Sequence, residues 1–308
     1  MTGPPRDGRD AGGIEPGDIA RVGPAPRARA AAPPLVVAAL GGDAVGFAAL
    51  LAKIAHDREF VCHSYKEKCL RRRIAVRLRA RGVATYAEYA DLLETDPREY
   101  DKLLDTLTIN VTKLFRNWET FAALLRIAVP SLWALPSQSL QIWSAGCASG
   151  EEAYSLATLF HRYATEHGEG DRTGRIQVLG TDIDRESLAA ANRATYLEPA
   201  FADTPSELRA EYFRGDTPAA VDPRIRTLVR FARLDLIRDP TPPKQHLIAC
   251  RNVIIYFDRT TQEELFVRFH DALVPGGFLV LGKVETLLGA TRSLFSPVDA
   301  RERIFRRV

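Results

Sequence analysis

The chain has 308 residues, of which 46% are hydrophobic, so it can bury one large core or two ordinary ones. Its formal net charge of +3 excludes a uniformly basic nucleic-acid-binding protein and confines any basic partner surface to one part of the chain. The four cysteines show no zinc-ligand spacing and the N-terminus lacks an apolar signal core, so neither a metal site nor a disulfide framework is expected.

Residues 1–34 contain mainly Gly, Pro, Ala and Arg, which predicts a disordered tail. The pattern then becomes helical, because apolar residues recur at helical spacing from residue 47 to 54 and from 70 to 78. We therefore predict a small helical domain over residues 35–108. The longest early apolar run, residues 35–40, is too short to span a membrane, so we expect a cytoplasmic protein without direct membrane insertion.

One predicted helix of this domain is strongly basic. Residues 65–81 carry eight Lys and Arg side chains around a narrow apolar stripe, and Gly82 ends the helix. The sequence leaves two interpretations open. The charges form either a solvated helix face that covers the core of the domain or a docking surface for an acidic partner.

Strands and helices alternate after residue 108, which favours a parallel sheet covered on both faces. The predicted strands are residues 140–144, 176–180, 228–234, 247–250 and 278–281. We assign residues 109–308 to this α/β domain. A proposed insertion, residues 205–232, fits either a small β excursion or a long loop.

The loop after the first predicted strand is the most informative part of the α/β domain. Ligands bind open α/β sheets at the carboxyl ends of the strands, and Gly146 and Gly150 let the backbone approach a ligand there. The spacing is not GxGxxG, and Glu151 and Glu152 occupy the helix N-terminus that would otherwise hold a pyrophosphate. The helix dipole alone accounts for acids at this position, but they also suit a cationic ligand.

S-adenosylmethionine fits this pattern because it carries a sulfonium and an ammonium group and no phosphate. Asp182 ends the second predicted strand, where an acid can accept hydrogen bonds from ribose hydroxyls. The two glutamates disfavour a nicotinamide cofactor. We therefore predict an S-adenosylmethionine pocket to which the loop of Gly146, the acids Glu151 and Glu152, and Asp182 contribute.

An ordered series of motifs extends from about residue 60 to the C-terminus. The motifs are Tyr65-Lys…Arg71-Arg-Arg-Ile74, Asn110-Val-Thr-Lys-Leu-Phe-Arg116, residues 144–154, Gly180-Thr-Asp-Ile-Asp184, Glu211-Tyr-Phe213 and Cys250-Arg-Asn-Val-Ile-Ile-Tyr-Phe257. Together they resemble the CheR-type chemoreceptor glutamate methyltransferases. The resemblance implies an all-α domain followed by a Rossmann-like α/β methyltransferase domain, with a small antiparallel β subdomain inserted over residues 205–232.

The same resemblance implies roles for individual residues. It places the following residues at the cofactor: Asn110, Thr112, Arg116, Glu152, Asp182, Asp235, Leu236, Arg251 and Asn252. Within this set, Glu152 would face the methionyl portion and Asp182 the ribose. Arg116 and Tyr256 match the residues that the family presents beside the transferred methyl group and the acceptor carboxylate.

The chemistry of these two catalytic candidates agrees with that placement. A glutamate carboxylate is ionised at about pH 7, so its methylation needs no general base and depends on in-line positioning. Arg116 can orient the carboxylate by paired hydrogen bonds, and the Tyr256 hydroxyl can hold the acceptor or crowd the methyl group. Without the resemblance, a half-buried aromatic beside Phe257 is the more ordinary interpretation of Tyr256.

The chain departs from the family pattern at several positions. An acidic residue is usual where His246 stands, a second phenylalanine where Leu114 stands, and asparagine where Asp235 stands. Lys283 and Val284 replace a common His-Ser pair near the predicted pocket. We interpret His246 and Leu114 as structural, whereas the Lys-Val pair could alter the acceptor preference. The insertion is short for the family, which predicts independence from a receptor tether peptide.

The expected reaction transfers a methyl group from S-adenosylmethionine to glutamate side chains of methyl-accepting chemoreceptors, yielding glutamyl methyl esters and S-adenosylhomocysteine. The basic helix over residues 65–81 would dock the helical cytoplasmic region of that partner, and the enzyme is expected to act as a monomer. Two alternatives stay open: a methyltransferase of the same fold with another acceptor, and a cofactor-binding or receptor-docking module without turnover. Nucleic acid is not the expected acceptor, because residues 250–253 do not match the Asn/Asp-Pro-Pro-aromatic motif of amino-methylating enzymes.

Overall fold

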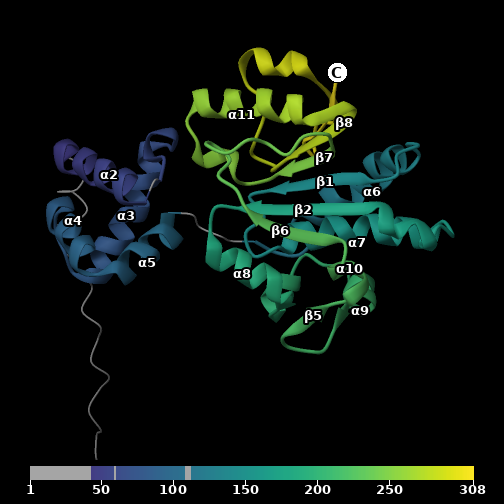
Figure 1. Cartoon of the computed structure of the whole chain (residues 1–308), viewed down its shortest axis with the longest axis horizontal. Helices are drawn as coiled ribbons and strands as arrows, with labels where there is room; N and C mark the ends of the chain where they lie inside the picture. Colours follow the sequence, from purple (N-terminus) through teal and green to yellow (C-terminus); the bar gives the residue numbers. More distant parts are fainter. Residues whose placement is uncertain (1–42, 59, 108–111) are drawn as a thin grey trace, which may run out of the picture.

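The computed structural model describes residues 43–58, 60–107 and 112–308, so the predicted tail over residues 1–34 lies outside the described residues. The described chain forms a helical domain followed by a larger α/β domain, which confirms the predicted fold class (Figure 1). None of the helices in these described ranges has the length and apolar character of a membrane span.

The helical domain packs around a core of its own. Its elements are α2 (Ala44–Arg58), the 3-10 turn η1 (Cys62–Ser64), α3 (Glu67–Arg81), α4 (Tyr86–Thr95) and α5 (Pro97–Leu107). The apolar positions predicted from helical spacing supply this core, and Ile74 and Leu78 are fully buried. Local sequence sets the helix ends: Gly82 ends α3 in the left-handed region at φ 69°, and Thr85 with Glu88 forms the capping box that begins α4.

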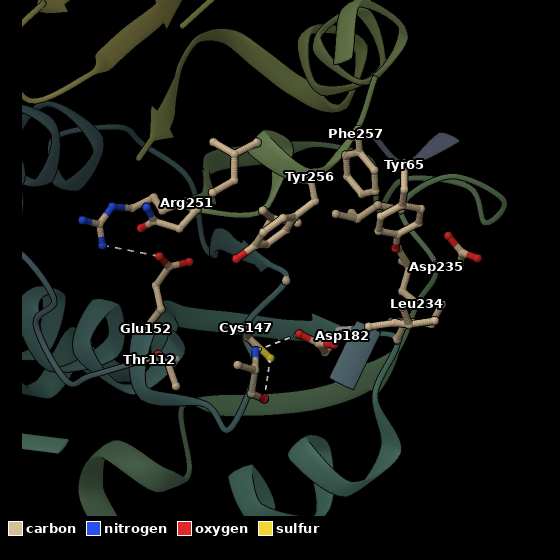
Figure 2. A pocket seen from close by; sticks show the side chains of 18 of the residues that line it. Tyr65, Thr112, Cys147, Glu152, Asp182, Leu234, Asp235, Arg251, Tyr256 and Phe257 are labelled. Atoms are coloured by element: carbon tan, nitrogen blue, oxygen red, sulfur yellow. Dashed lines mark hydrogen bonds and ion pairs between the residues drawn. The ribbon is translucent and has the colours of Figure 1, made fainter. Parts of the chain in front are cut away.

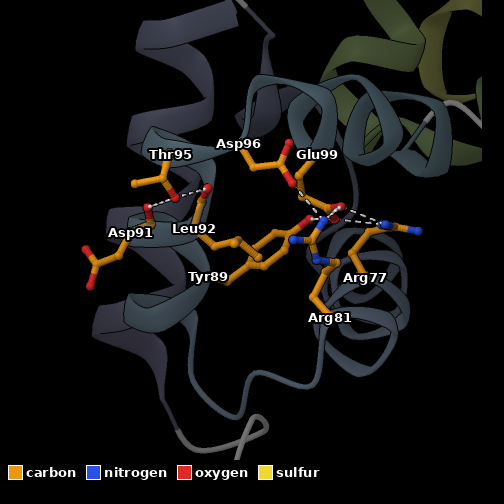
Figure 3. Close-up of polar contacts among 8 residues, drawn as sticks. All are labelled: Arg77, Arg81, Tyr89, Asp91, Leu92, Thr95, Asp96 and Glu99. Atoms are coloured by element: carbon orange, nitrogen blue, oxygen red, sulfur yellow. Dashed lines mark hydrogen bonds and ion pairs between the residues drawn. The ribbon is translucent and has the colours of Figure 1, made fainter.

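A charged cluster joins α3, α4 and α5 through the carboxylate of Glu99 (Figure 3). The fully buried Glu99 accepts hydrogen bonds from Arg77 at 2.8 and 2.9 Å and from the Tyr89 hydroxyl at 2.8 Å, and Arg81 lies 3.1 Å from the same carboxylate. Burial would raise the pKa of Glu99, but the hydrogen bonds from Arg77 and Tyr89 outweigh it and lower the pKa. Two cations of the basic helix are therefore structural.

The α/β domain is built on a sheet of seven strands in the order β6-β2-β1-β7-β8-β10-β9. The strands are β1 (Leu140–Ala145), β2 (Ile176–Asp182), β6 (Val229–Arg233), β7 (Gln245–Cys250), β8 (Leu273–Leu281), β9 (Phe295–Asp299) and β10 (Ile304–Arg307). The first five in spatial order are parallel and overlap the five predicted strands. The last two pair antiparallel and were not predicted, because a proline interrupts β9 and β10 is half arginine.

Helices cover both faces of this sheet. Alternating side chains of β1 show the two layers: Ile142 packs into the core shared with α6 (Trp118–Trp133) and α7 (Glu151–Glu166). Trp143 points to the other face, where its ring lies 5.6 Å from Phe269 of α11 (Arg259–Ala272). Figure 1 shows α7 and α11 on opposite sides of the sheet. The short helix α8 (Arg185–Arg193) follows β2 and contacts β2 and β6.

A second, three-stranded antiparallel sheet is inserted between α8 and β6. Its strands are β3 (Thr195–Tyr196), β4 (Phe213–Arg214) and β5 (Ala219–Val221), in the order β3-β5-β4, with α9 (Ser206–Tyr212) and α10 (Pro223–Arg226) beside them. This sheet begins before the predicted insertion over residues 205–232, and the end of that range belongs to β6. The boundary differs because a strand of two residues gives no alternation to detect.

The helical domain contacts the α/β domain at the loop that follows β7. Tyr65 forms an antiparallel bridge to Phe257, and the two rings lie 5.0 Å apart. The Lys66 backbone N–H donates to the Tyr256 carbonyl at 2.9 Å, while its ammonium group donates to the Ile255 carbonyl at 2.8 Å. Residues just before α3 are thus attached directly to the segment that carries Tyr256.

Candidate active site

A pocket lies where the order of the parallel strands reverses, between β1 and β7 (Figure 2). Loops after β1, β2, β6 and β7 form most of its wall, and the helical domain adds Tyr65, Arg73 and Leu107. The predicted site residues that line it are Thr112, Arg116, Gly146, Glu152, Asp182, Asp235, Leu236, Arg251, Asn252 and Tyr256. Asn110 lies outside the described residues.

Gly146 shapes the floor of the pocket. It has φ 81°, and a Cβ atom at this position would lie 2.5 Å from a methyl carbon of Val253 in the loop after β7. The backbone N–H groups of Gly146 and Cys147 both donate to the Thr181 carbonyl, at 2.8 and 2.9 Å. Only glycine allows the β1 loop to approach the β7 loop this closely in this conformation.

Glu152 presents a buried carboxylate from the first turn of α7. Its Oε1 accepts a hydrogen bond from the Ser144 hydroxyl at 2.7 Å, and its Oε2 lies 3.6 Å from Nη1 of Arg251. Burial raises the pKa of Glu152, and the charge of Arg251 opposes this shift. The neighbouring Glu151 does not line the pocket, and its carboxylate accepts a hydrogen bond from the Ser149 hydroxyl, whose oxygen lies 2.8 and 2.9 Å from its two oxygens. Only one of the two glutamates is therefore available to a cationic ligand.

Arg251 joins two parts of the site. Besides facing Glu152, its Nη2 donates to the Arg116 carbonyl at 2.8 Å and to the Asn117 side chain at 3.3 Å. Burial lowers the pKa of Arg251, and the charge of Glu152 opposes this shift. Arg251 therefore also fixes the segment that carries Arg116.

Asp182 stands at the end of β2 and keeps acceptor capacity toward the pocket. Its Oδ2 accepts from the Ala148 N–H at 2.8 Å and its Oδ1 from the Asp184 N–H at 3.0 Å, which leaves further lone pairs on both oxygens. Burial raises the pKa of Asp182, and these backbone hydrogen bonds oppose the shift. Asp235 mainly caps a turn, because its Oδ1 accepts from the Ile237 N–H at 2.8 Å.

Figure 2 shows the Tyr256 side chain entering the pocket from the side opposite Glu152 and Asp182. Tyr256 is the last residue of the 3-10 turn η4 (Ile254–Tyr256) and is half-buried. The more ordinary interpretation, a half-buried aromatic beside Phe257, describes its burial correctly but not its place in the pocket wall.

Glu285 was missed in the sequence, although it follows the Lys-Val pair that marks a departure from the family. Its buried carboxylate accepts from the backbone N–H groups of Gly282 at 2.6 Å, Asn252 at 2.9 Å and Ile255 at 3.2 Å. Burial raises its pKa, and the same backbone hydrogen bonds oppose the shift. Glu285 thus fixes the loop that carries Asn252 and Tyr256. The available signal was an acid in the loop that follows a predicted strand.

The departures from the family pattern lie away from the pocket wall, with the exception of Asp235. Lys283 forms an ion pair with Glu302, and Val284 is 73% exposed. His246 accepts from the Gln141 N–H at 3.0 Å through Nδ1, in the amino-terminal half of β7. Leu114 is fully buried. His246 and Leu114 therefore have structural surroundings, and the Lys-Val pair does not reach the pocket.

The groups in the pocket fit S-adenosylmethionine. Glu152 offers a carboxylate to an ammonium group, and Asp182 offers acceptors to ribose hydroxyls. Asn252 Oδ1 is a buried acceptor with no hydrogen-bond partner among the described residues, as expected of a group that a ligand satisfies.

Two family models match the chain: "CheR methyltransferase, SAM binding domain" over residues 110–304 and "CheR methyltransferase, all-alpha domain" over residues 46–108. The chain belongs to the CheR methyltransferase family.

Relatives within the CheR family match most of this chain. The chemotaxis protein methyltransferase of Listeria innocua is 33% identical over 227 residues, covering 73% of this chain and 83% of the relative. That of Escherichia coli is 34% identical over 235 residues, covering 73% of this chain and 78% of the relative. A 104.1 kDa protein of Rhodobacter capsulatus is 35% identical over 246 residues, or 79% of this chain, but the match spans only 25% of that larger protein. As a CheR methyltransferase, the protein uses S-adenosylmethionine as its methyl donor.

Proposed function

We propose that this protein methylates glutamate side chains of methyl-accepting chemoreceptors, forming glutamyl methyl esters in chemotaxis or related signalling. One observation carries the choice of acceptor. Among the described residues that line the pocket there is no histidine, and its carboxylates have other expected roles: Glu152 and Asp182 face the cofactor, and Asp235 caps a turn. An acceptor that is already ionised needs no general base, and a glutamate carboxylate meets this condition.

Basic side chains in the wall of the pocket support an anionic acceptor. Arg73, Lys113 and Arg116 line it together with Arg251. Bound S-adenosylmethionine supplies an electrophilic methyl group on its sulfonium. Arg116 would orient the incoming carboxylate and Tyr256 would restrict its approach, so these residues contribute positioning rather than proton transfer.

The exposed face of α3 supports docking of an acidic helical partner. Arg73, Arg77 and Arg81 are engaged within the protein, in agreement with the structural interpretation of the basic helix. Lys68, Arg72 and Arg79 remain exposed at spacings that place them along one side of the helix. Docking is therefore proposed for this exposed stripe rather than for all eight cations. Independence from a tether peptide, the monomeric state and the cytoplasmic location stay predictions.

The test is incubation with radiolabelled S-adenosylmethionine and a receptor cytoplasmic fragment. We expect label on the fragment that mild base releases as methanol, because esters hydrolyse under these conditions. A fragment whose exposed glutamates are replaced by alanine is the matched control and should stay unlabelled. Base-stable label, or label only on nucleic acid or a small molecule, would reject the proposed acceptor.

A further inference from the structure

Arg73 occupies the buried side of α3, facing away from the exposed basic stripe. It is only 2% exposed, and its guanidinium carbon lies 4.1 Å from the centre of the Tyr256 ring. Its Nη1 donates a hydrogen bond to the carbonyl of Leu107, the last residue of α5. One side chain thus joins two helices of the helical domain to the aromatic ring that enters the pocket.

The ring of Tyr256 packs against this guanidinium in the interior of the protein. Among the described residues, Nε and Nη2 of Arg73 have no hydrogen-bond partner. Burial lowers the pKa of Arg73, and the interaction with Tyr256 opposes this shift. A guanidinium that is largely removed from water is attracted to the π face of an aromatic ring more strongly than an exposed one.

Hydrogen bonds hold the main chain of Tyr256, whereas its ring is covered by Arg73. The Tyr256 carbonyl accepts from the Lys66 N–H at 2.9 Å, and its own N–H donates to the Val253 carbonyl at 3.2 Å. These bonds leave the side-chain torsions unconstrained. The guanidinium at 4.1 Å covers one face of the ring and so limits the orientation of the hydroxyl.

We propose that Arg73 is a positioning residue for methyl transfer, which holds the Tyr256 ring in its orientation over the pocket and links it to α3. The same helix carries the docking stripe on its exposed side. A partner that binds α3 therefore contacts the same helix that holds the Tyr256 side chain in the loop after β7. This inference rests on the proposed function where it concerns the acceptor. The effect of Arg73 on the position of the Tyr256 ring does not depend on that function.

The kinetic test compares substitutions at two adjacent positions of α3. Arg73→Met keeps side-chain volume and removes the charge, so we expect kcat for receptor methylation to fall about 10- to 30-fold, with KM for the receptor and Kd for S-adenosylhomocysteine changed less than about threefold. Arg73→Lys keeps a cation and should recover part of kcat. Arg72→Met, on the exposed stripe, should instead raise KM. A loss in Arg73→Met that is confined to KM, or no loss in kcat, would overturn the proposal.

A spectroscopic test is independent of the acceptor. With 3-fluorotyrosine at position 256, the fluorine resonance should shift and broaden in Arg73→Met, and Arg73→Lys should restore it in part. An unchanged resonance would overturn the proposal even if kcat falls. If wild-type protein methylates no receptor but the resonance responds as expected, the proposed function fails and the positioning role stands. Should Arg73→Met not fold, Arg73→Lys serves in both measurements, with a smaller loss and shift expected in the same direction.

Discussion

Glu152 is the pocket residue for which protonation has the clearest consequence. Burial raises its pKa, so it takes up a proton at a higher pH than an exposed glutamate does. The protonated form would lose the ion pair that we expect Glu152 to make with the ammonium group of the cofactor. We therefore expect affinity for S-adenosylhomocysteine, measured by calorimetry, to fall as the pH falls through the raised pKa of Glu152.

The matched variant is Glu152→Gln, which keeps the shape of the side chain and removes its charge. It should weaken cofactor binding by about 10- to 100-fold at neutral pH, the range expected for a lost charged hydrogen bond. It should also flatten the pH dependence. Equal pH profiles for the wild type and this variant would mean that another group controls binding.

Glu285 has no expected contact with the reacting groups, yet three backbone N–H groups depend on it. Glu285→Ala would leave these donors unpaired in a buried place, at a cost of about 2 kcal/mol or more in unfolding free energy. Because the loop that carries Asn252 would loosen, cofactor affinity should fall as well. Chemical denaturation and calorimetry measure the two effects.

The control for this position is Lys283→Ala, which removes the ion pair with Glu302 outside the pocket wall. It should leave cofactor affinity within about twofold of the wild type. A large loss of affinity in Lys283→Ala would show that this departure from the family does act on the site.

At the scale of elements, the basic helix is stabilised by the buried Glu99 cluster rather than only by its apolar stripe. The pKa of Glu99 is lowered in the folded state, so its contribution to stability is present above the unfolded value and is lost as the pH falls through the folded value. Glu99→Ala leaves Arg77, Arg81 and Tyr89 without their shared partner and should cost about 3 kcal/mol or more in unfolding free energy.

Thermal unfolding checks this expectation, with Glu94→Ala as the matched control. Glu94 also pairs with a cation, Lys53 at 3.1 Å, but its side chain is 66% exposed. Its removal should change Tm little. Similar Tm values for the two variants would contradict a special role for the buried cluster.

Sequence patterns predicted elements whose signal is local and missed contacts that only the fold creates. The helical core, the five parallel strands and the placement of Gly146 and Asp182 follow from spacing and position on strands, whereas the family resemblance selected Glu152 over Glu151. By contrast, Arg73 with Tyr256, and Glu285 with Asn252, meet across long stretches of chain. No periodicity marks such pairs, because each partner is ordinary in its own segment. The short strand β3 and the antiparallel edge strands β9 and β10 also lacked the alternation of apolar residues by which a strand is predicted.

At the scale of the whole molecule, the exposed cations of α3 predict a salt-dependent encounter with an acidic partner. Charge reversal at Lys68 and Arg72 should raise KM for the receptor about 10-fold or more at low salt and weaken the dependence of KM on ionic strength. Cofactor affinity should stay unchanged, since neither residue lines the pocket. Initial-rate measurements over a range of salt concentrations check this. If KM changes neither on charge reversal nor with salt concentration, the receptor does not dock on this face of α3.

The central claim concerns the acceptor, and mass spectrometry of a receptor cytoplasmic fragment tests it most directly. After incubation with S-adenosylmethionine and the wild-type protein, fragment spectra should locate added methyl groups on glutamate side chains. Arg116→Ala and Tyr256→Phe, assayed in parallel, should slow their appearance. Methyl groups on any other residue type, or an unmodified receptor with a protein that binds the cofactor normally, would contradict the account.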